Sequence, residues 1–171
     1  SCISINVKRR RTFRIKSIKL IMLKLVRTNS ENTDFINLVK KLDSYLTIVD
    51  GDDHDFYNQY NNIDVLKHVV VAYQNRIPVG CGAFKEFDKT SVEIKRMYTN
   101  PESRSGGIAS KILKELEVWS NELGYNSCVL ETGIRQVEAV QFYKKNDYSI
   151  ISNFGPYENV ENSLCFKKEL I

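Results

Sequence analysis

Apolar residues follow two periodicities along the chain, one typical of helices and one typical of strands. Helical spacing predicts helices over 33–47, 108–123 and 136–145. Runs rich in β-branched and aromatic residues predict strands over 20–27, 65–73, 77–87, 91–99, 126–132, 148–154 and 162–169. Asn32 or Thr33 is positioned to cap the first helix, and Gly124 to end the second.

The order of these elements indicates the fold class. A strand and helices come first, then a meander of three strands whose connections carry turn residues at 74–76 and 88–89. Two strand–helix steps and a closing hairpin follow. This order predicts an α/β (α+β) fold in which a mixed sheet is covered by helices.

Composition supports one compact domain and draws attention to the N-terminus. The chain has 171 residues, 42% of them hydrophobic, and no apolar run reaches the 18 or so residues of a membrane span. Residues 1–21 contain seven Lys and Arg and no acid, so the rest carries 18 basic and 21 acidic residues. We therefore expect a basic arm, 1–21, followed by the functional domain, 22–171.

The basic arm has several interpretations. It could contact nucleic acid or a membrane surface, or act as a targeting leader. Alternatively it is foreign to the domain, or its start is placed upstream of Met22. We favour these two alternatives over a functional arm, and we expect neither a nucleic-acid nor a membrane partner.

The cysteines and histidines argue against metal and disulfide chemistry. No pair of cysteines has the C-x-x-C spacing of a zinc or redox site; they are Cys2, Cys81, Cys128 and Cys165. We interpret them as reduced residues of a cytoplasmic protein. Only two histidines occur, His54 and His68, so we expect no metal site.

The strongest functional motif lies between a predicted strand and the helix over 108–123. It reads Arg104-Ser105-Gly106-Gly107-Ile108-Ala109. A glycine-containing loop at a helix N-terminus directs free N–H groups and the positive end of the helix dipole at one point, which suits a pyrophosphate. Arg104 can add charge-assisted hydrogen bonds. The spacing is not that of a P-loop or of a dinucleotide-binding fold.

The segment Ser91 to Glu102, followed by this loop, resembles the acetyl-CoA motif of the GNAT family of N-acetyltransferases. A second block of that family is a strand, a helix beginning Asn-x-x-Ala-x-x-x-Tyr, and a Gly-containing turn. Here it reads 130–133, then Gln136-x-x-Ala139-x-x-Phe142-Tyr143, then 146–148. Gln136 replaces the usual Asn, and Asn146-Asp147 the usual Gly. The resemblance extends over about 22–170 and implies a mostly antiparallel sheet with helices on both faces.

The resemblance implies a site for acetyl-CoA as co-substrate. The loop would hold the pyrophosphate, and the backbone of Met97 and Thr99 the pantetheine arm. The full set of residues expected to contact it is Met97, Tyr98, Thr99, Arg104, Ser105, Gly106, Gly107, Ile108, Ala109, Ser110, Gln136, Ala139 and Phe142.

Two residues are candidates for proton transfer. Glu93 lies where many members of the family carry the general base, and Tyr143 matches the family tyrosine that is the proposed acid for the leaving thiolate. A base is needed because an alkylamine of pKa ~10.4 is protonated at pH 7, and removing that proton costs about 4.6 kcal/mol. The structural alternatives are a strand Glu paired with Lys95 or with a neighbouring strand, and a core aromatic beside Phe142.

The acceptor should bind near the polar segment 50–62, which predicts a short helix with flanking loops. Its aspartates and aromatic residues could receive a cationic amine, although a solvated helix start is the simpler interpretation. The candidates for contact with the acceptor are His54, Phe56, Tyr57, Glu131 and Tyr157.

Together these residues predict an acetyltransferase that moves an acetyl group from acetyl-CoA to a primary amine by direct attack in a ternary complex. The alternative is a non-catalytic acetyl-CoA-binding or regulatory module on the same fold. The acceptor could be a small molecule or a peptide amine, and a homodimer remains open.

Overall fold

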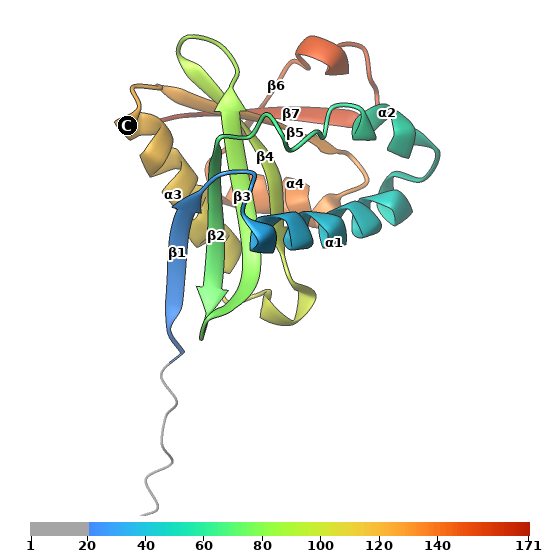
Figure 1. Cartoon of the computed structure of the whole chain (residues 1–171). Coiled ribbons are helices and arrows are strands. Elements are labelled where there is room, and N and C mark those ends of the chain that lie inside the picture. The colour runs from blue at the N-terminus through green and yellow to red at the C-terminus, as the bar shows by residue number, and fades with distance from the viewer. Residues whose placement is uncertain (1–20) are drawn as a thin grey trace, which may run out of the picture.

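The computed structural model describes residues 21–171, so the basic arm lies outside the described residues except for Ile21. One seven-stranded sheet forms the centre of the molecule, with the strand order β1-β2-β3-β4-β5-β7-β6 (Figure 1). The strands are β1 (Leu23–Thr28), β2 (His68–Gln74), β3 (Ile77–Glu86), β4 (Ser91–Thr99), β5 (Ser127–Gly133), β6 (Ser149–Ile151) and β7 (Ser163–Glu169). Within this sheet β4 and β5 pair in parallel and every other neighbouring pair is antiparallel.

Helices cover both faces of the sheet. The α-helices are α1 (Thr33–Asp50), α2 (His54–Asn58), α3 (Ile108–Glu122) and α4 (Val137–Lys145), and the short 3-10 turns are η1 (Gly51–Asp53), η2 (Pro101–Ser103) and η3 (Gly155–Tyr157). α1 and α2 lie on one face, and α3 and α4 on the other (Figure 1). The predicted mixed, mostly antiparallel sheet with helices on both faces is confirmed.

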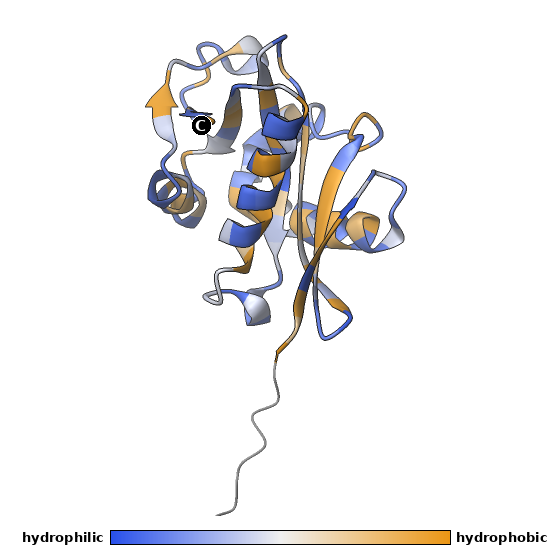
Figure 2. Ribbon diagram, turned by 90° about the vertical axis from the view of Figure 1, so that its left-hand side faces the viewer, coloured by the Kyte–Doolittle hydropathy of each residue, from blue (hydrophilic) through white to orange (hydrophobic). Residues whose placement is uncertain are grey.

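Period-two alternation in the strands builds a core on each face. The larger core packs α3 and α4 against strand residues, namely Val70, Ala72, Phe84, Val92, Ile94, Cys128, Leu130 and Phe166. The intervening residues of β2 and β3 face α1, where Val69, Val71, Cys81 and Ala83 meet Phe35, Leu38 and Val39. Hydrophobic and hydrophilic residues alternate along the helices, as expected for helices that bury one side (Figure 2).

This alternation decides where the charged strand residues lie. Val92 and Ile94 of β4 face α3, so Glu93 and Lys95 between and beyond them face α1 and α2. By the same argument Leu130 faces α3 and Glu131 faces the α2 side. The sheet therefore gathers its buried charges on the face opposite α3.

The N-terminus of α1 is as predicted, but its C-terminus lies further along the chain. The Asn32 side chain accepts a hydrogen bond from the Phe35 N–H at 2.9 Å, which confirms Asn32 as the cap. The helix was expected to end at 47 because its apolar spacing stops at Leu46. It continues to Asp50 and ends at Gly51, whose φ of +54° favours glycine. Asp50 is thereby carried into the interior, where it is 5% exposed.

Other boundaries differ from the sequence prediction at the ends of strands. β2 begins at His68 rather than at 65, and β6 covers only 149–151 of the predicted 148–154. β6 is an edge strand that pairs with β7 over three residues. Phe154 instead packs its ring against Tyr157. None of the helices between residues 21 and 171 has the length and apolar character needed to cross a membrane.

Candidate active site

The site begins where two neighbouring strands stop pairing. The β4–β5 ladder joins Ser91 to Ser127 and ends at the Glu93–Val129 pair, although both strands continue beyond it. Just past this point Arg96 adopts a φ of +58°, and its buried guanidinium forms an ion pair with Asp43 of α1. Beyond this point β4 and β5 no longer pair with each other, and two adjoining hollows lie next to their ends.

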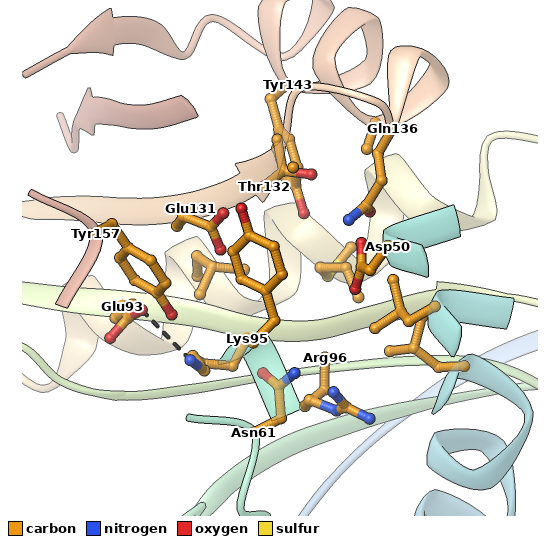
Figure 3. A pocket seen from close by; sticks show the side chains of 17 residues that line it. Asp50, Asn61, Glu93, Lys95, Arg96, Glu131, Thr132, Gln136, Tyr143 and Tyr157 are labelled. Atoms are coloured by element: carbon orange, nitrogen blue, oxygen red, sulfur yellow. Dashed lines mark ion pairs between the residues drawn. The ribbon is translucent and has the colours of Figure 1, made fainter. Parts of the chain in front are cut away.

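The first hollow, which we call the central pocket, has a volume of about 110 Å³ and lies between the ends of β4 and β5, the end of α1 and the start of α4. Its polar lining includes three carboxylates, from Asp50, Glu93 and Glu131, together with Lys95. Figure 3 shows the Asp50, Glu131 and Tyr143 side chains directed into this pocket. A small polar group is therefore the kind of ligand that the pocket can accept.

The second hollow, the outer groove, has a volume of about 210 Å³ and runs from the central pocket towards the start of α3. Its lining is more apolar, and it is formed by Leu42, Tyr45, Met97, Tyr98, Thr99, Arg104, Ala109, Gln136, Glu138, Ala139, Phe142 and Tyr143. Five residues line both hollows: Leu42, Met97, Gln136, Ala139 and Tyr143. A molecule in the groove can thus meet a molecule in the pocket at these residues.

Of the three carboxylates in the central pocket, Glu131 is the one whose negative charge is least stabilised by neighbouring groups. Its Oε1 atom is buried and has no hydrogen-bond partner among the described residues, and no ion pair to it is formed there. Burial raises the pKa of Glu131 to about 7, and the nearby charges of Asp50 and Glu93 act in the same direction. The Ser163 hydroxyl and the Lys95 ammonium oppose this shift without cancelling it. A carboxylate with this pKa can exchange a proton near neutral pH.

Asp50 is a second buried carboxylate in the same pocket. Burial raises its pKa, while the charges of His54 and Arg135 and a hydrogen bond from Gln136 lower it. Its main-chain oxygen accepts a hydrogen bond of 3.0 Å from Arg135 Nη1, which holds the end of α1 against the β5–α4 loop. Asp50 and Glu131 together give the pocket a negative field suited to a cation.

Glu93, in contrast, is compensated by two lysines. Its Oε2 atom lies 3.7 Å from Lys85 Nζ, and its Oε1 atom 3.5 Å from Lys95 Nζ (Figure 3). The Glu93 and Lys95 side chains are 7% and 9% exposed. Lys85 is the cross-strand neighbour of Glu93, and Lys95 lies two residues along on the same face of β4. Glu93 is thus the centre of a Lys–Glu–Lys group in which Glu93 and Lys95 are buried.

Tyr143 connects the pocket and the groove. Its ring packs in the larger core against Phe142, Tyr148 and Phe166, and its side chain lines both hollows. Burial and the nearby Glu131 charge raise the pKa of its hydroxyl above the ordinary value. The hydroxyl therefore keeps its proton at neutral pH and can act as a donor.

The loop before α3 is arranged to receive an anion. Gly107 is the N-cap of α3 with a φ of +75° and provides no side-chain cap, so the N–H groups of the first turn remain available. No atom lies within 4 Å of a Cβ placed on Gly107, so the positive φ, rather than crowding within the protein, is what favours glycine there. The first turn contains no acidic residue that would oppose an anion.

Arg104 lies at the mouth of the groove, between α1 and α4. Its Nε donates a 3.0 Å hydrogen bond to the Thr99 carbonyl, its guanidinium lies 5.9 Å from the Tyr45 ring, and its Nη1 is 3.9 Å from Glu138. The Glu138 side chain is 86% exposed, so this ion pair is weak. The guanidinium is therefore free to turn towards an incoming anion.

The end of β4 can also bind a ligand through its backbone. The Asn100 N–H bonds to Val79 of β3, so the Thr99 N–H points to the opposite edge, where β5 no longer pairs. The expected main-chain contacts of a ligand at Met97 and Thr99 stay a prediction. A chain of alternating amides and methylenes fits such an edge.

The predicted coenzyme residues fall into two groups. Eight of them line the outer groove: Met97, Tyr98, Thr99, Arg104, Ala109, Gln136, Ala139 and Phe142. Ser105, Gly106, Gly107 and Ser110 belong to the loop and first turn of α3, beside the groove. Ile108 is 4% exposed with its side chain in the larger core, so only its backbone is available to a ligand.

The predicted acceptor residues divide in a similar way. Tyr57, Glu131 and Tyr157 line the central pocket. His54 is not among its lining residues; its Nε2 atom lies 3.4 Å from Thr47 Oγ1. Phe56 also lies outside the pocket and packs its ring edge-to-face against Tyr57 and Tyr60. The short helix α2 thus contributes one tyrosine to the pocket, and Phe56 packs against that tyrosine.

Several residues of the central pocket were not predicted from the sequence, and Asp50 and Lys95 are two of them. Asp50 appeared only as part of an acidic run, and the expected end of its helix lay three residues earlier. Lys95 appeared only as a partner for Glu93. The alternation of β4 could have shown that Glu93 and Lys95 share a face, but nothing local indicates which face is hollow. Within residues 21–171 there is no group of three or more His, Cys, Asp or Glu side chains that could hold a metal ion.

Comparisons with known proteins agree with this arrangement. A family model for an acetyltransferase (GNAT) domain matches residues 66–150. The IAA acetyltransferase of Azospirillum brasilense is 29% identical over 144 residues, which make up 79% of this chain and 90% of that protein. The residues that the family model matches include the loop before α3 and the parts of the central pocket that come from β4, β5 and α4.

Solved structures share the fold. A protein assigned as an acyl-CoA N-acyltransferase from Klebsiella pneumoniae subsp. pneumoniae superposes with a TM-score of 0.73 at 26% identity, over 88% of this chain and 99% of that one. A GNAT family acetyltransferase from Elizabethkingia anophelis, solved with acetyl-CoA bound, gives a TM-score of 0.63 at 18% identity, over 86% and 98% of the two chains.

Proposed function

Because the chain belongs to the GNAT family of acetyltransferases, we propose that it transfers the acetyl group of acetyl-CoA to a primary amine by direct attack in a ternary complex. Acetyl-CoA occupies the outer groove and the amine occupies the central pocket. The observation that carries this proposal is the junction of the two hollows, where Tyr143 and an uncompensated Glu131 meet.

The protein positions acetyl-CoA mainly through its own main-chain groups, with one contribution from the Arg104 side chain. The α3 N-terminus and Arg104 hold the pyrophosphate, which is doubly charged and benefits from both the helix dipole and the guanidinium. The free edge of β4 at Met97 and Thr99 binds the amides of the pantetheine arm. These contacts bring the thioester to the junction beside Tyr143.

Glu131 is our candidate for the general base. The acceptor enters as an ammonium, which the negative field of Asp50 and Glu131 favours. With a pKa of about 7, Glu131 can take the ammonium proton, directly or through a water, and the free amine then has a lone pair for attack. Glu93 is a weaker candidate because two lysine ammonium groups already compensate its charge.

Tyr143 is our candidate for the general acid. The amine nitrogen forms a bond to the carbonyl carbon and the carbon–sulfur bond breaks, so the electron pair of that bond goes to sulfur. The Tyr143 hydroxyl gives its proton to the thiolate, and the proton released from the amine re-protonates the tyrosine by way of solvent. The products are the acetamide, free coenzyme A and one proton, which is the ammonium proton that Glu131 took up and then releases to solvent.

An acceptor-panel assay tests the proposal. Release of free thiol from acetyl-CoA is followed with each amine in turn, and the acetylated amine is identified by mass spectrometry. The expected result is thiol release that depends on one class of amine and is lost in Glu131→Gln but kept in Glu161→Gln, an exposed glutamate outside both hollows. Tight binding of acetyl-CoA without turnover on any primary amine would instead indicate a binding module.

A further inference from the structure

A third hollow adjoins the central pocket on the side away from the outer groove. This side cavity has a volume of about 440 Å³ and is lined in part by Tyr60, Lys85, Phe87, Lys95, Phe154 and Tyr157. It shares Glu93, Lys95 and Tyr157 with the central pocket, so these side chains lie between the two hollows. None of the proposed chemistry uses this space.

The volumes of the hollows indicate that the side cavity can hold the part of an acceptor that does not react. The central pocket, at about 110 Å³, has room for the reacting amine and little more, whereas the side cavity offers about 440 Å³. The outer groove on the other side is filled by acetyl-CoA in the proposed reaction. An acceptor larger than a short aminoalkyl group must therefore extend past Lys95 and Tyr157 into the side cavity.

Aromatic rings form much of the wall of the side cavity. Phe87 and Phe154 meet edge-to-face with ring centroids 4.7 Å apart, and Phe154 and Tyr60 each contact Tyr157 at 6.0 and 5.9 Å. Phe87 is 40% exposed, so a large apolar ring is left facing solvent at the rim. A flat apolar body would cover these rings and gain edge-to-face or offset contacts with them.

The charged side chains of the side cavity include a buried carboxylate between two lysines. Lys85 and Lys95 provide two positive charges around the single carboxylate of Glu93. Glu86 also reaches the lining, but it is exposed and its Oε2 atom accepts a hydrogen bond of 2.8 Å from Tyr125. Burial lowers the pKa of Lys95, while the charges of Glu93 and Glu131 act in the opposite direction. Lys85 is the more accessible of the two, with 38% of its side chain exposed.

We propose that the acceptor is a primary amine whose flat aromatic body carries a carboxylate. The amine lies in the central pocket, the ring lies against Phe87 and Phe154, and the carboxylate pairs with Lys85. This inference rests on the proposed function, and it adds the class of acceptor. A carboxylate suits the site because it brings one negative charge to a group with one excess positive charge.

A matched pair of acceptors tests this. Transfer to 4-(aminomethyl)benzoate is compared with transfer to 4-(aminomethyl)benzamide, which has the same shape and amine but no charge. We expect kcat/KM to be about tenfold higher for the benzoate, mainly through KM, which is the effect of one charge-assisted hydrogen bond. Lys85→Gln should remove this preference, by lowering kcat/KM for the benzoate about tenfold more than for the benzamide. Lys89→Gln, an exposed lysine in the next turn, should keep the preference.

The outcomes separate this inference from the proposed function. Equal kcat/KM for the two acceptors, or an equal loss for both in Lys85→Gln, overturns the acceptor class and leaves acetyl transfer intact. Failure of both acceptors also overturns the acceptor class, and turnover of other amines in the panel then decides whether acetyl transfer itself stands. Thermal unfolding of Lys85→Gln, compared with the parent, shows whether a loss reflects the missing charge or a damaged fold.

Discussion

The outer groove and the central pocket share five lining residues, yet they are built in different ways. The groove takes its polar groups from two short segments, 97–110 and 136–142, and relies on backbone N–H groups and the half-exposed Arg104. The pocket takes its polar groups from the end of α1, from α2, β4 and β5, and from η3. Its important groups are carboxylates in a buried setting.

This difference separates binding from proton transfer. Backbone amides and a helix N-terminus bind phosphate without changing any protonation state, so they can be exposed. A base that works at neutral pH needs a pKa near 7, and burial provides this for Glu131. Changes in the pocket should therefore affect turnover, whereas changes in the groove should affect affinity for the coenzyme.

The largest expected effect is that of Glu131→Gln on turnover. The amide keeps the size of the side chain but cannot accept the ammonium proton, so kcat at pH 7 should fall by about a thousandfold, within the range for a positioned base. The Kd for acetyl-CoA, measured by calorimetry, should change by less than about twofold. Glu161→Gln serves as the control. A Glu131→Gln enzyme with kcat within tenfold of the parent would remove Glu131 from the mechanism.

The next largest effect is expected for Tyr143→Phe. The ring and its contacts with Phe142, Tyr148 and Phe166 remain, so stability and coenzyme affinity should hardly change. Loss of the acid should lower kcat by about a hundredfold, with little change in KM for acetyl-CoA. Tyr125→Phe, which also removes a hydroxyl but lies outside both hollows, is the matched control. Turnover within threefold of the parent would make Tyr143 a core aromatic only.

Changes in the groove should weaken binding instead. Gly107→Val forces a β-branched residue into a φ of +75°, and Arg104→Ala removes a guanidinium that is 39% exposed. Each should raise the Kd for acetyl-CoA by about tenfold, as measured by calorimetry. At saturating acetyl-CoA, kcat should stay within about threefold. A large fall in kcat with unchanged Kd would contradict the separation of binding from chemistry.

The raised pKa of Glu131 also predicts a gain in stability for Glu131→Gln. The pKa of Glu131 is raised from 4.5 to about 7, so the folded state keeps a proton that the unfolded chain loses between these values. Stability therefore falls as pH rises from 4.5 to 7, by roughly 2–3 kcal/mol, and stays low above pH 7. Glu131→Gln should raise Tm by several degrees at pH 8 and leave it nearly unchanged at pH 4.5, as measured by calorimetry. An unchanged Tm at pH 8 would contradict the raised pKa.

The sequence predicted much more of the groove than of the pocket. The strand over 91–99, the loop at 104–109 and the helix that follows are contiguous, so local periodicity and glycine placement identify them together. The pocket depends on where β4 and β5 stop pairing and on how far α1 extends. Both features depend on tertiary packing, and no local sequence pattern predicts them.

Glu93 illustrates this limit. Its strand, its position near the start of that strand and its pairing with Lys95 were all visible in the sequence. The second partner, Lys85, comes from the neighbouring strand in a register that depends on an irregularity between Cys81 and Ala83. Glu131 was recognised as an acceptor residue, but its lack of an ion-pair partner appears only when all elements are assembled.

The most direct test of Glu131 as the base is the pH dependence of kcat/KM for an acceptor whose own pKa is about 9 or higher. If Glu131 removes the proton from a bound ammonium, the parent profile should rise to about pH 7 and then level off. Glu131→Gln can use only the free amine, so its profile should keep rising towards the pKa of the acceptor. Glu93→Gln should retain the plateau of the parent. A parent profile that rises without levelling, or a plateau that survives in Glu131→Gln and disappears in Glu93→Gln, would contradict this account.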